Sequence, residues 1–429
     1  MLIQFSTENY LSFKQEASLN FEAGAIKEFP ENVFEPLDFH DVTLLKSIAL
    51  YGANSSGKSN LLKAFSFARN LIINSSKESQ SYESLNVEPF RLSDEGETTA
   101  SKFDVTFLLK GNRYRYGFSV NAKRIESEWL FVGNKRKQEN IFIRSHQDFK
   151  LNKILHFGET KNKAVMLTEI TRENALFLSV LAQFNIELGI NICDWFSKST
   201  IIFDSNNQEI INYTASLLSK PDFYSRINQI VSNSDLGFTS IDAKVKDIAQ
   251  KYNRNEQFIA ALFNEDIKSY QILTKHKKFK DGVYIGNIFF DLMQNESLGT
   301  QKYFGLLGPI IQTLLRGSVL LIDELDSRFH PLLLNIILKL FNSKMNNPNG
   351  AQLVFTLHNT DPLKKILRRD QMIFLEKDNY GASTFCSLYE KLPKTRNDAS
   401  FEKDYLTGKY GAIPNIINTQ LKLFGMSDD

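Results

Sequence analysis

The segment "YGANSSGKSNLLKAF", residues 51–65, contains the most informative pattern in the chain. It fits G-x-x-x-x-G-K-[ST] through four residues: Gly52, Gly57, Lys58 and Ser59. This pattern is typical of a loop whose backbone N–H groups close on phosphate oxygens in front of a helix N-terminus. A surface turn rich in small residues is the alternative, so the sequence on either side of the loop has to distinguish the two.

The flanks of this loop have the order that a phosphate-binding loop requires. Residues 44–51, "LLKSIALY", form an apolar run of strand length. After the loop, apolar residues recur at helical spacing and predict a helix that begins near Lys58. In such a site Lys58 would reach the β- and γ-phosphates, and the Ser59 hydroxyl would hold Mg²⁺. We therefore predict a nucleoside triphosphate site with the contacts Gly52, Asn54, Ser55, Ser56, Gly57, Lys58, Ser59 and Asn60.

The composition argues against several other classes of protein. The chain has 429 residues, a net charge of +2, 42% hydrophobic and 23% charged residues, which is typical of a globular protein with two or three lobes. Cys193 and Cys386 lie far apart and predict neither a disulfide framework nor a zinc site. The N-terminus lacks the features of a signal peptide, and no charge-free apolar run has spanning length. We expect a cytoplasmic protein without a membrane partner.

The periodicity changes along the chain. Strict alternation on both sides of residues 110–112 predicts a hairpin, which residues 124–132 and 140–145 would extend into an antiparallel sheet with one covered face. From Thr171 to about Val231 the pattern is helical, and short strands return after Gly237. The last third alternates strands and helices, which indicates a parallel α/β sheet. Because the phosphate loop and the later strands must share that sheet, we expect both ends of the chain to build the nucleotide site.

An acidic pair follows one of the later strands. In "VLLIDELD", residues 319–326, four apolar residues predict a buried strand, and Asp323 and Glu324 stand at its carboxyl end. Ligands bind at this end in open α/β sheets. We expect Asp323 to support Mg²⁺ and Glu324 to polarise the attacking water as a general base. An acidic pair of this kind could instead cap a helix.

Two further segments narrow the class of nucleotide-binding protein. In "NESLGTQKYFGLLGPIIQTLL", residues 295–315, Gly299 and Thr300 precede a predicted helix and supply a second helix N-terminus. In "LVFTLHNT", residues 353–360, a buried strand ends at His358. Taken alone, His358 is more typical of a strand-end histidine without a special role.

Together these motifs resemble the head of the ABC-class ATPases, which include SMC, RecF-like and OLD-like proteins. The resemblance implies that two heads hold ATP between the Walker A loop of one and the signature of the other. It implies contacts in trans from Ser297, Gly299, Thr300 and Gln301, a place for Asp326 at the dimer seam, and γ-phosphate sensing by His358. The signature departs from L-S-G-G-Q, because Leu298 fills the usual serine position. This leaves open whether the Ser297 or the Thr300 hydroxyl makes the contact.

Other segments resemble one group within this class. The opening "MLIQFSTENYLSF", "VEPFRLSDE", "YRYGFSV" with "EWLFV", and the tail "FEKDYLTGKYGAIPNI" are similar to the AAA15/AAA21-type ATPases of bacterial abortive-infection systems, the AbiLi/RloA-like proteins. The tail could also be a loop that closes onto the core. The resemblance implies an ATP- and Mg²⁺-dependent ATPase that works as a homodimer or higher oligomer. It would sense or regulate a separately encoded effector, a nuclease or toxin, in antiphage defence.

The implied fold is α/β, an ABC-class P-loop ATPase head with a parallel core sheet, an antiparallel β lobe and a helical insertion. We expect the N-terminal part of the head with Walker A over residues 1–75 and the antiparallel lobe over 76–150. The helical insertion would span 151–235. The rest of the head, with the signature, Walker B and the histidine, would span 236–390, and a tail packed on the head would span 391–429.

Alternative functions remain open at this point. No H-E-x-x-H, G-x-S-x-G or Cys/His cluster occurs, and too few residues follow His358 for the metal-binding nuclease domain of OLD-like proteins. The basic runs at 275–280 and 364–369 could contact nucleic acid, although solvated surface explains them as well. A RecF/SMC-like DNA-repair ATPase and an ATP-locked scaffold that sequesters a toxin are the competing hypotheses.

Overall fold

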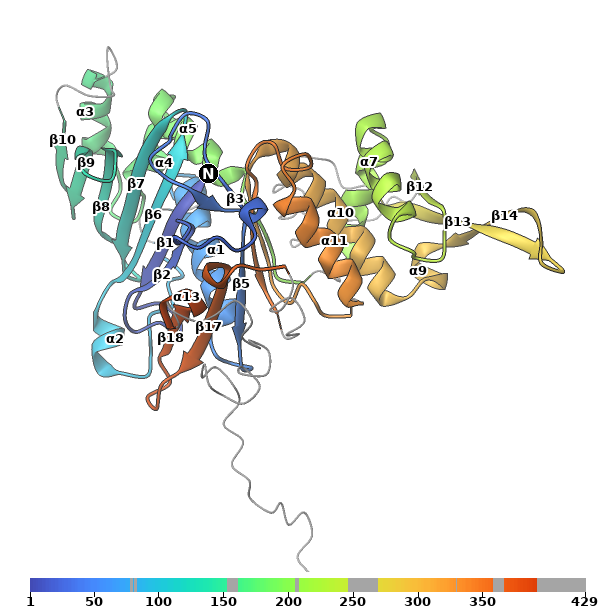
Figure 1. Cartoon of the computed structure of the whole chain (residues 1–429). Coiled ribbons are helices and arrows are strands. Elements are labelled where there is room, and N and C mark those ends of the chain that lie inside the picture. Colours follow the sequence, from blue (N-terminus) through green and yellow to red (C-terminus); the bar gives the residue numbers. More distant parts are fainter. Residues whose placement is uncertain are drawn as a thin grey trace, which may run out of the picture.

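The computed structural model describes most of the chain (Figure 1). The described residues are 1–77, 80, 83–152, 161–204, 208–245, 269–328, 330–357 and 366–391. Two predictions lie outside them: the role of His358 and the packing of the tail at 391–429, of which only the helical end at residue 391 is described.

A six-stranded sheet forms the centre of the molecule. Its strand order is β11 (Thr200–Ile202), β15 (Val319–Ile322), β16 (Gln352–Thr356), β5 (Ser47–Gly52), β17 (Met372–Lys377) and β18 (Ser383–Ser387). All neighbouring strands are parallel except β17 and β18. The N-terminal β5 lies between the C-terminal β16 and β17, which confirms that both ends of the chain build this sheet.

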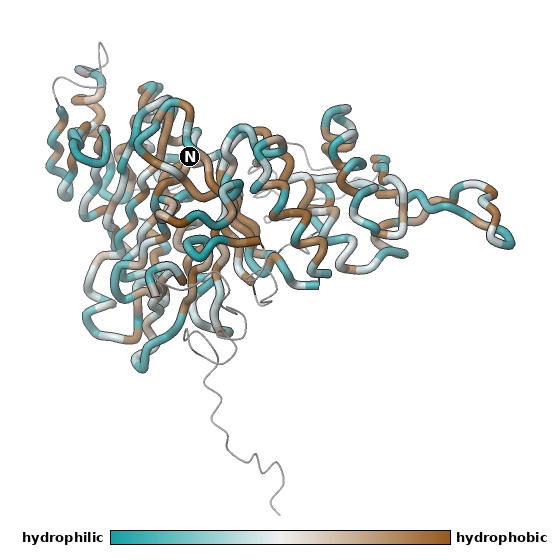
Figure 2. Tube along the Cα trace, in the orientation of Figure 1, coloured by the Kyte–Doolittle hydropathy of each residue, from teal (hydrophilic) through white to brown (hydrophobic). Residues whose placement is uncertain are grey.

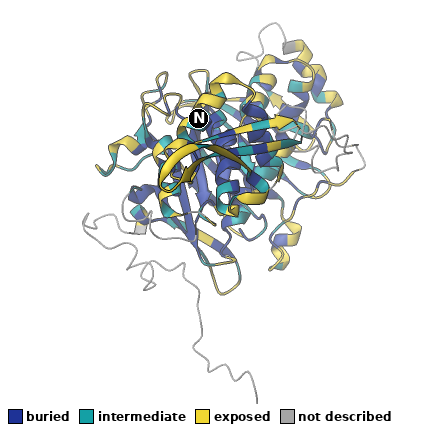
Figure 3. Ribbon diagram, turned by 90° about the vertical axis from the view of Figure 1, so that its right-hand side faces the viewer, coloured by how far each residue is buried: buried dark blue, intermediate teal, exposed yellow. Residues whose placement is uncertain are grey.

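The central sheet is buried on both faces. Leu50 of β5 packs into one hydrophobic core with α1 (Lys58–Asn74) and the antiparallel sheet. Tyr51 points to the other face and packs with α10 (Leu298–Arg316) and α11 (Pro331–Asn342). Successive strand residues face opposite sides, so a strand covered on both faces reads as a continuous apolar run. Figure 3 shows the resulting buried centre in dark blue.

A seven-stranded antiparallel sheet packs beside this centre. Its order is β10 (Asp148–Leu151), β9 (Gln138–Ser145), β8 (Ile125–Gly133), β7 (Asn112–Val120), β6 (Ser101–Leu109), β1 (Leu2–Glu8) and β2 (Ala17–Asn20). The predicted hairpin and its extension are confirmed. Because β1 and β2 complete the sheet, the lobe expected over residues 76–150 also includes the first strands of the chain.

Two short helices cover the antiparallel sheet. They are α4 (Phe177–Gln183) and α5 (Glu187–Ser197). Phe107 of β6 stacks on Trp195 of α5 at a centroid distance of 4.4 Å. This aromatic packing explains why one face of the sheet is apolar.

The region expected to be helical contains one strand. Helices α3 (Lys161–Ile170), α4 and α5 precede it, and α6 (Gln208–Leu217) and α7 (Pro221–Ser232) follow. Between them β11 adds to the edge of the parallel sheet, with Ile202 opposite Ile322. Three residues are too few to show strand periodicity, so the sequence pattern did not reveal β11. The insertion expected over 151–235 therefore returns to the core sheet at Thr200.

The third sheet leads into the signature segment. It contains β12 (Ser240–Val245), β13 (Tyr270–Lys280) and β14 (Val283–Asp291), and β13 and β14 extend away from the body in Figure 1. After α9 (Leu292–Asn295), the Ser297 hydroxyl accepts a hydrogen bond from the Thr300 N–H and caps α10. Gly299 and Thr300 thus lie inside the first turn of the helix rather than before it, because Ser297 is the better cap.

The remaining described elements are short. They are β3 (Val33–Phe34), β4 (Leu44–Leu45), α2 (Asp94–Thr98), α13 (Leu388–Lys391) and 3₁₀ turns at Pro30–Asn32 and Arg369–Gln371. None of the helices within the described ranges is both long and apolar enough to cross a membrane.

Candidate nucleotide site

Two serines from distant segments, Ser12 and Ser383, lie against the glycine loop. Gly57 has a φ of 110° and caps α1 without a side chain. A Cβ at this position would lie 2.4 Å from the Ser383 Oγ and 2.9 Å from the Ser12 Oγ, so only glycine fits. Ser383 also donates to the Ser56 carbonyl at 2.7 Å. The sequence motif identifies Gly57, whereas its supports from distant segments were not predicted.

Lys58 bends back over the loop. Its Nζ donates to the carbonyl oxygens of Gly52 at 2.6 Å and Ala53 at 3.0 Å. Burial lowers the pKa of Lys58 below its usual value, while the carboxylates of Asp323, Asp326 and Glu324 oppose this shift. The three acids therefore act on Lys58 across the loop, and the cation lies where a phosphate chain would need it.

The acidic pair lies at the carboxyl end of β15, as predicted. Thr356, at the end of neighbouring β16, donates to the Asp323 Oδ1 at 2.6 Å and accepts from the Glu324 N–H at 2.7 Å. Glu324 has a φ of 47°, a left-handed conformation that is strained for a non-glycine residue, and its side chain is exposed. Thr356 thus fixes the turn that directs one acid inward and the other to the solvent.

These residues meet at one cavity of about 650 Å³. Its lining consists of residues 54–60 of the loop together with Asp323, Glu324, Thr356 and Lys377. Ser59 and Asp323 provide a hydroxyl and a carboxylate, and only one Asp323 oxygen is engaged by a described residue. Oxygen ligands of this kind are those that Mg²⁺ prefers, so the residues fit a nucleotide with its metal ion. Lys377, an exposed residue at the end of β17, was not predicted because nothing marks it in the sequence.

Helix α10, which begins with the predicted signature, is joined to the acidic turn by a buried lysine. The Lys302 Nζ donates to the Glu324 carbonyl at 2.7 Å, the Ser327 carbonyl at 3.0 Å and the Ser327 Oγ at 2.6 Å. Burial lowers the pKa of Lys302 to about 8, although Asp326 and Glu324 oppose the shift. Sequence analysis missed Lys302, since a lysine that ends up buried looks like any other lysine in a helix.

The predicted signature residues do not line the cavity of their own chain. A Cβ at Gly299 would lie 2.4 Å from the Arg328 carbonyl oxygen, so the helix start packs directly on the turn after β15. The Gln301 side chain is buried and donates to the Glu296 carbonyl at 2.9 Å. Ser297 is exposed, and Thr300 is half-buried. Ser297 and Thr300 are thus more accessible to a ligand than Gln301.

Residues 47–158 and 197–361 match a protein family described as "AAA domain, putative AbiEii toxin, Type IV TA system". The chain belongs to this AAA family. The match confirms the resemblance to an AAA21-type ATPase and covers the loop, the signature segment and the acidic pair. No curated protein matches the sequence.

Two solved structures are similar to this AAA family member. The "SMC head domain from Thermotoga maritima" is 14% identical, with 90% of this chain and 98% of that chain covered and a TM-score of 0.41. The structure of "the recombination mediator protein RecF-ATP in RecFOR pathway" is 15% identical, with 90% and 97% covered and a TM-score of 0.29.

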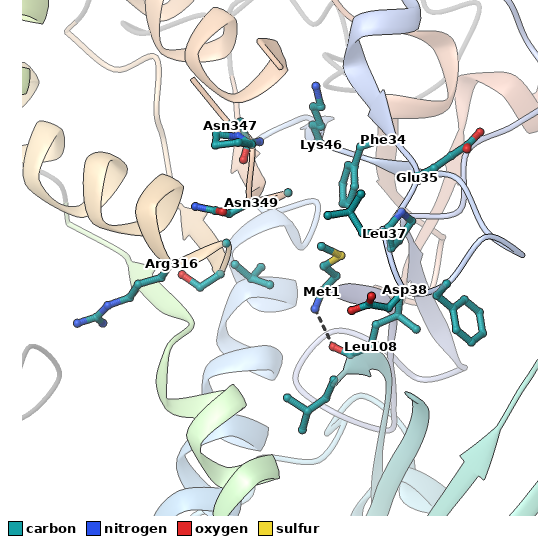
Figure 4. Close-up of a pocket in the computed structure, with 18 of the residues that line it drawn as sticks. Met1, Phe34, Glu35, Leu37, Asp38, Lys46, Leu108, Arg316, Asn347 and Asn349 are labelled. Carbon is teal, nitrogen blue, oxygen red and sulfur yellow. Dashed lines mark hydrogen bonds between the residues drawn. The ribbon is translucent and has the colours of Figure 1, made fainter. Parts of the chain in front are cut away.

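A larger cavity, about 900 Å³, lies at the amino end of the central sheet. Figure 4 shows Met1 among its lining, with the N-terminal amine bonded to the Leu108 carbonyl at 2.9 Å. Burial lowers the pKa of this amine to about 5. The cavity contains no glycine loop and no acidic pair at a strand end, so the arrangement of groups rather than the volume identifies the nucleotide site.

Proposed function

We propose that this AAA family member hydrolyses ATP between two copies of the chain and thereby regulates a separately encoded effector, a nuclease or toxin, in abortive-infection defence against phage. The observation that supports hydrolysis most directly is the meeting of the loop, Lys58, Asp323 and Glu324 at one cavity. The family description, which names a putative toxin and a type IV toxin–antitoxin system, supports a role in such a system.

Each residue of the site has its own task in this proposal. Lys58 leaves the loop carbonyls and neutralises the β- and γ-phosphates. Ser59 and Asp323 would hold Mg²⁺, which would supply further positive charge for the phosphate oxygens. Glu324, exposed at the cavity, takes the proton from the attacking water. His358 remains the proposed γ-phosphate sensor.

The signature residues act in trans in this proposal. A helix N-terminus attracts phosphate through free N–H groups and a positive dipole. Because the start of α10 does not line its own cavity, Ser297, Gly299 and Thr300 would contact the ATP of the opposite copy, with Asp326 at the seam. Gln301 would first have to release the Glu296 carbonyl.

Leu298 offers the sharpest test of this arrangement. Gly299 is unsuitable, since any side chain would collide with the Arg328 carbonyl and disturb the fold itself. Leu298 is 56% exposed and occupies the usual signature serine position. Leu298→Glu places a carboxylate at the helix start, where it suits the isolated helix but repels a phosphate. Leu298→Gln is the matched neutral control.

We expect Leu298→Glu to bind ATP but not to hydrolyse it, while Leu298→Gln stays active. Mixing Leu298→Glu with Lys58→Ala chains then creates mixed dimers with one doubly defective and one intact composite site. Partial hydrolysis should return in this mixture. A mixture that stays inactive although mixed dimers form, or a fully active Leu298→Glu variant, would refute the trans role.

The proposed regulation of a separately encoded effector is tested by a different experiment, in cells. The chain should be expressed with and without its neighbouring gene, and phage plating should be measured for wild type and Lys58→Ala. Protection that requires both the neighbour and Lys58 supports the regulator. Full protection by the chain alone would contradict a separate effector.

A further inference from the structure

The β13–β14 hairpin is an exposed arm with an unusual surface. Its two strands are joined by Asp281 and Gly282, both at positive φ, as in the tight turns that connect antiparallel strands. Strand β12 pairs with Tyr270–Lys275, so among the described residues the outer part of the arm consists of two strands. Figure 1 shows this arm extending from the body, and Figure 2 shows hydrophobic and hydrophilic residues side by side along it.

One face of the arm combines lysines with aromatic rings. The pairing register places Lys275 opposite Phe289, Lys277 opposite Asn287, and Phe279 opposite Tyr284. Directly opposed residues share a face, as do alternate residues along β13. We call this set the lysine–aromatic face: Lys275, Lys277, Phe279, Tyr284, Asn287 and Phe289.

The rings of this face are open to solvent. Phe289 is 56%, Phe279 55% and Tyr284 52% exposed, and the latter two rings lie 6.1 Å apart. Neither lysine forms an ion pair with a carboxylate of a described residue, although the register places Asp242 and Asp291 on either side of Leu273, next to Lys275 on the same side of the sheet. Large exposed apolar groups mark interaction sites. A two-stranded hairpin also has little stability of its own, so a bound partner would stabilise the arm.

We propose that the lysine–aromatic face binds single-stranded nucleic acid. Lysines neutralise the phosphate backbone, and unpaired bases stack on exposed rings without regard to sequence. A duplex hides its base faces and would leave the rings unused. A second copy of the arm, packed face to face, would bring four lysine charges into one interface, which disfavours this partner. An acidic polypeptide would match the lysines but has no flat faces for the three rings.

Side chains at the base of the arm form hydrogen bonds with Glu296, the residue before the predicted signature. The Thr274 hydroxyl donates to the Glu296 Oε1 at 2.7 Å, and the His276 Nε2 lies 2.8 Å from the same oxygen. Glu296 directly precedes Ser297, the cap of α10. A strand bound to the arm would therefore alter hydrolysis through the signature helix, an effect that rests on the proposed function, whereas binding itself does not.

Binding is tested with the full chain and fluorescein-labelled oligothymidine or oligouridine, by anisotropy over a range of salt concentrations. Lys275→Gln/Lys277→Gln should weaken binding and reduce the slope of log affinity against log salt by about one to two. The matched control, Lys278→Gln/Lys280→Gln, removes the same charge from the opposite face. It should stay within about threefold of wild type, because salt screens the more distant charges.

The rings are tested separately. Phe279→Ala and Phe289→Ala should each lower the affinity about tenfold, through lost stacking, with little change in the salt slope. ATP binding, measured in the same variants, should remain at the wild-type value. A wild type that binds oligonucleotide but not ATP would refute the proposed function and leave the arm's role intact.

Four results would overturn the assignment of the arm. One is an equal loss of oligonucleotide affinity when either lysine pair is replaced by glutamine. Another is an oligonucleotide affinity that stays unchanged in Phe279→Ala and Phe289→Ala. The third is displacement of the oligonucleotide by polyglutamate as readily as by polyuridine, which would point to an acidic protein. Ring variants that lose self-association while the wild type binds no oligonucleotide would instead assign the arm to a second copy of this chain.

Discussion

Two buried lysines at opposite ends of β5 have different tasks. Lys46 directly precedes the strand, and its Nζ donates to the carbonyls of Glu31 at 2.7 Å and Asn342 at 2.8 Å, which come from distant segments. Lys58 follows the glycine loop and donates to carbonyls of that same loop. Lys46 therefore ties the fold together, whereas Lys58 can exchange its local partners for a phosphate chain.

The cavities at these two ends show the same contrast. The larger one is lined by loops and by the N-terminus, while the smaller one collects a glycine loop, two acids and a threonine at the ends of parallel strands. In a parallel sheet, the carboxyl ends of all strands lie at one edge and the amino ends at the other. Chemistry is thus expected at the carboxyl edge and stability at the amino edge.

The largest expected difference comes from replacing each lysine by alanine. Lys58→Ala should abolish ATP binding and hydrolysis, because it removes the cation nearest the phosphates. Lys46→Ala should bind ATP like wild type but unfold more easily, since the Glu31 carbonyl and the buried Asn342 carbonyl lose their donor. Isothermal titration with ATP compares the ATP affinities of the two variants, and chemical denaturation compares their free energies of unfolding. ATP affinity unchanged in Lys58→Ala would contradict the assignment of the loop.

Next in size is the loss of the proposed general base. Glu324→Gln should hydrolyse ATP about 10²–10⁴-fold more slowly while it binds ATP normally, since Ser59 and Asp323 are unchanged. Single-turnover rates and binding measurements separate the two effects. Hydrolysis at the wild-type rate would mean that another residue activates the water.

A smaller effect is expected from the threonine that positions both acids. Thr356→Val removes the hydrogen bonds to the Asp323 Oδ1 and the Glu324 N–H, and should slow hydrolysis about tenfold with a stability loss of about 1–3 kcal/mol. Thr214→Val is the matched control. Its hydroxyl also accepts from one N–H, but it donates to a carbonyl where Thr356 donates to a carboxylate, and it does not line the cavity.

The control should lose similar stability and keep the wild-type rate per folded molecule. Equal rates in the two variants would mean that Thr356 only supports the fold. Magnesium titration adds a second readout, because only Thr356→Val should change the metal dependence.

The smallest effect concerns pH. Burial lowers the pKa of Lys46 from 10.5 to about 8, so between these values the unfolded chain binds more protons than the folded one. The free energy of unfolding should then rise with pH in this window, by at most about 1.4 kcal/mol per pH unit. Lys46→Met should show a smaller rise in denaturation curves, because it loses this contribution while that of Lys302, whose pKa burial also lowers to about 8, remains. Identical pH slopes for wild type and variant would show that Lys46 does not titrate there.

Much of the fold and part of the site could be predicted from the sequence. The glycine loop, the helix after it, the acidic pair and the antiparallel hairpin all leave local patterns, because neighbouring residues determine backbone conformation and side-chain direction. The α/β alternation also predicted that the loop and the acids share one parallel sheet, whereas the order of the strands around β5 was not predicted. The short strand β11 was missed because its three residues form a strand only when β15 is beside them.

The sequence by itself determined that this chain has a phosphate-binding loop, an acidic strand end and a family resemblance. Only the tertiary structure determined that Thr356 and Lys302 fix the acidic turn, that Ser12 and Ser383 support Gly57, and that lysines and aromatic rings share one face of the arm. The physical reason is the range of the interactions. A motif is formed by residues that are neighbours in the chain, whereas a buried threonine or lysine acquires its role from carbonyls and carboxylates that folding brings from distant segments.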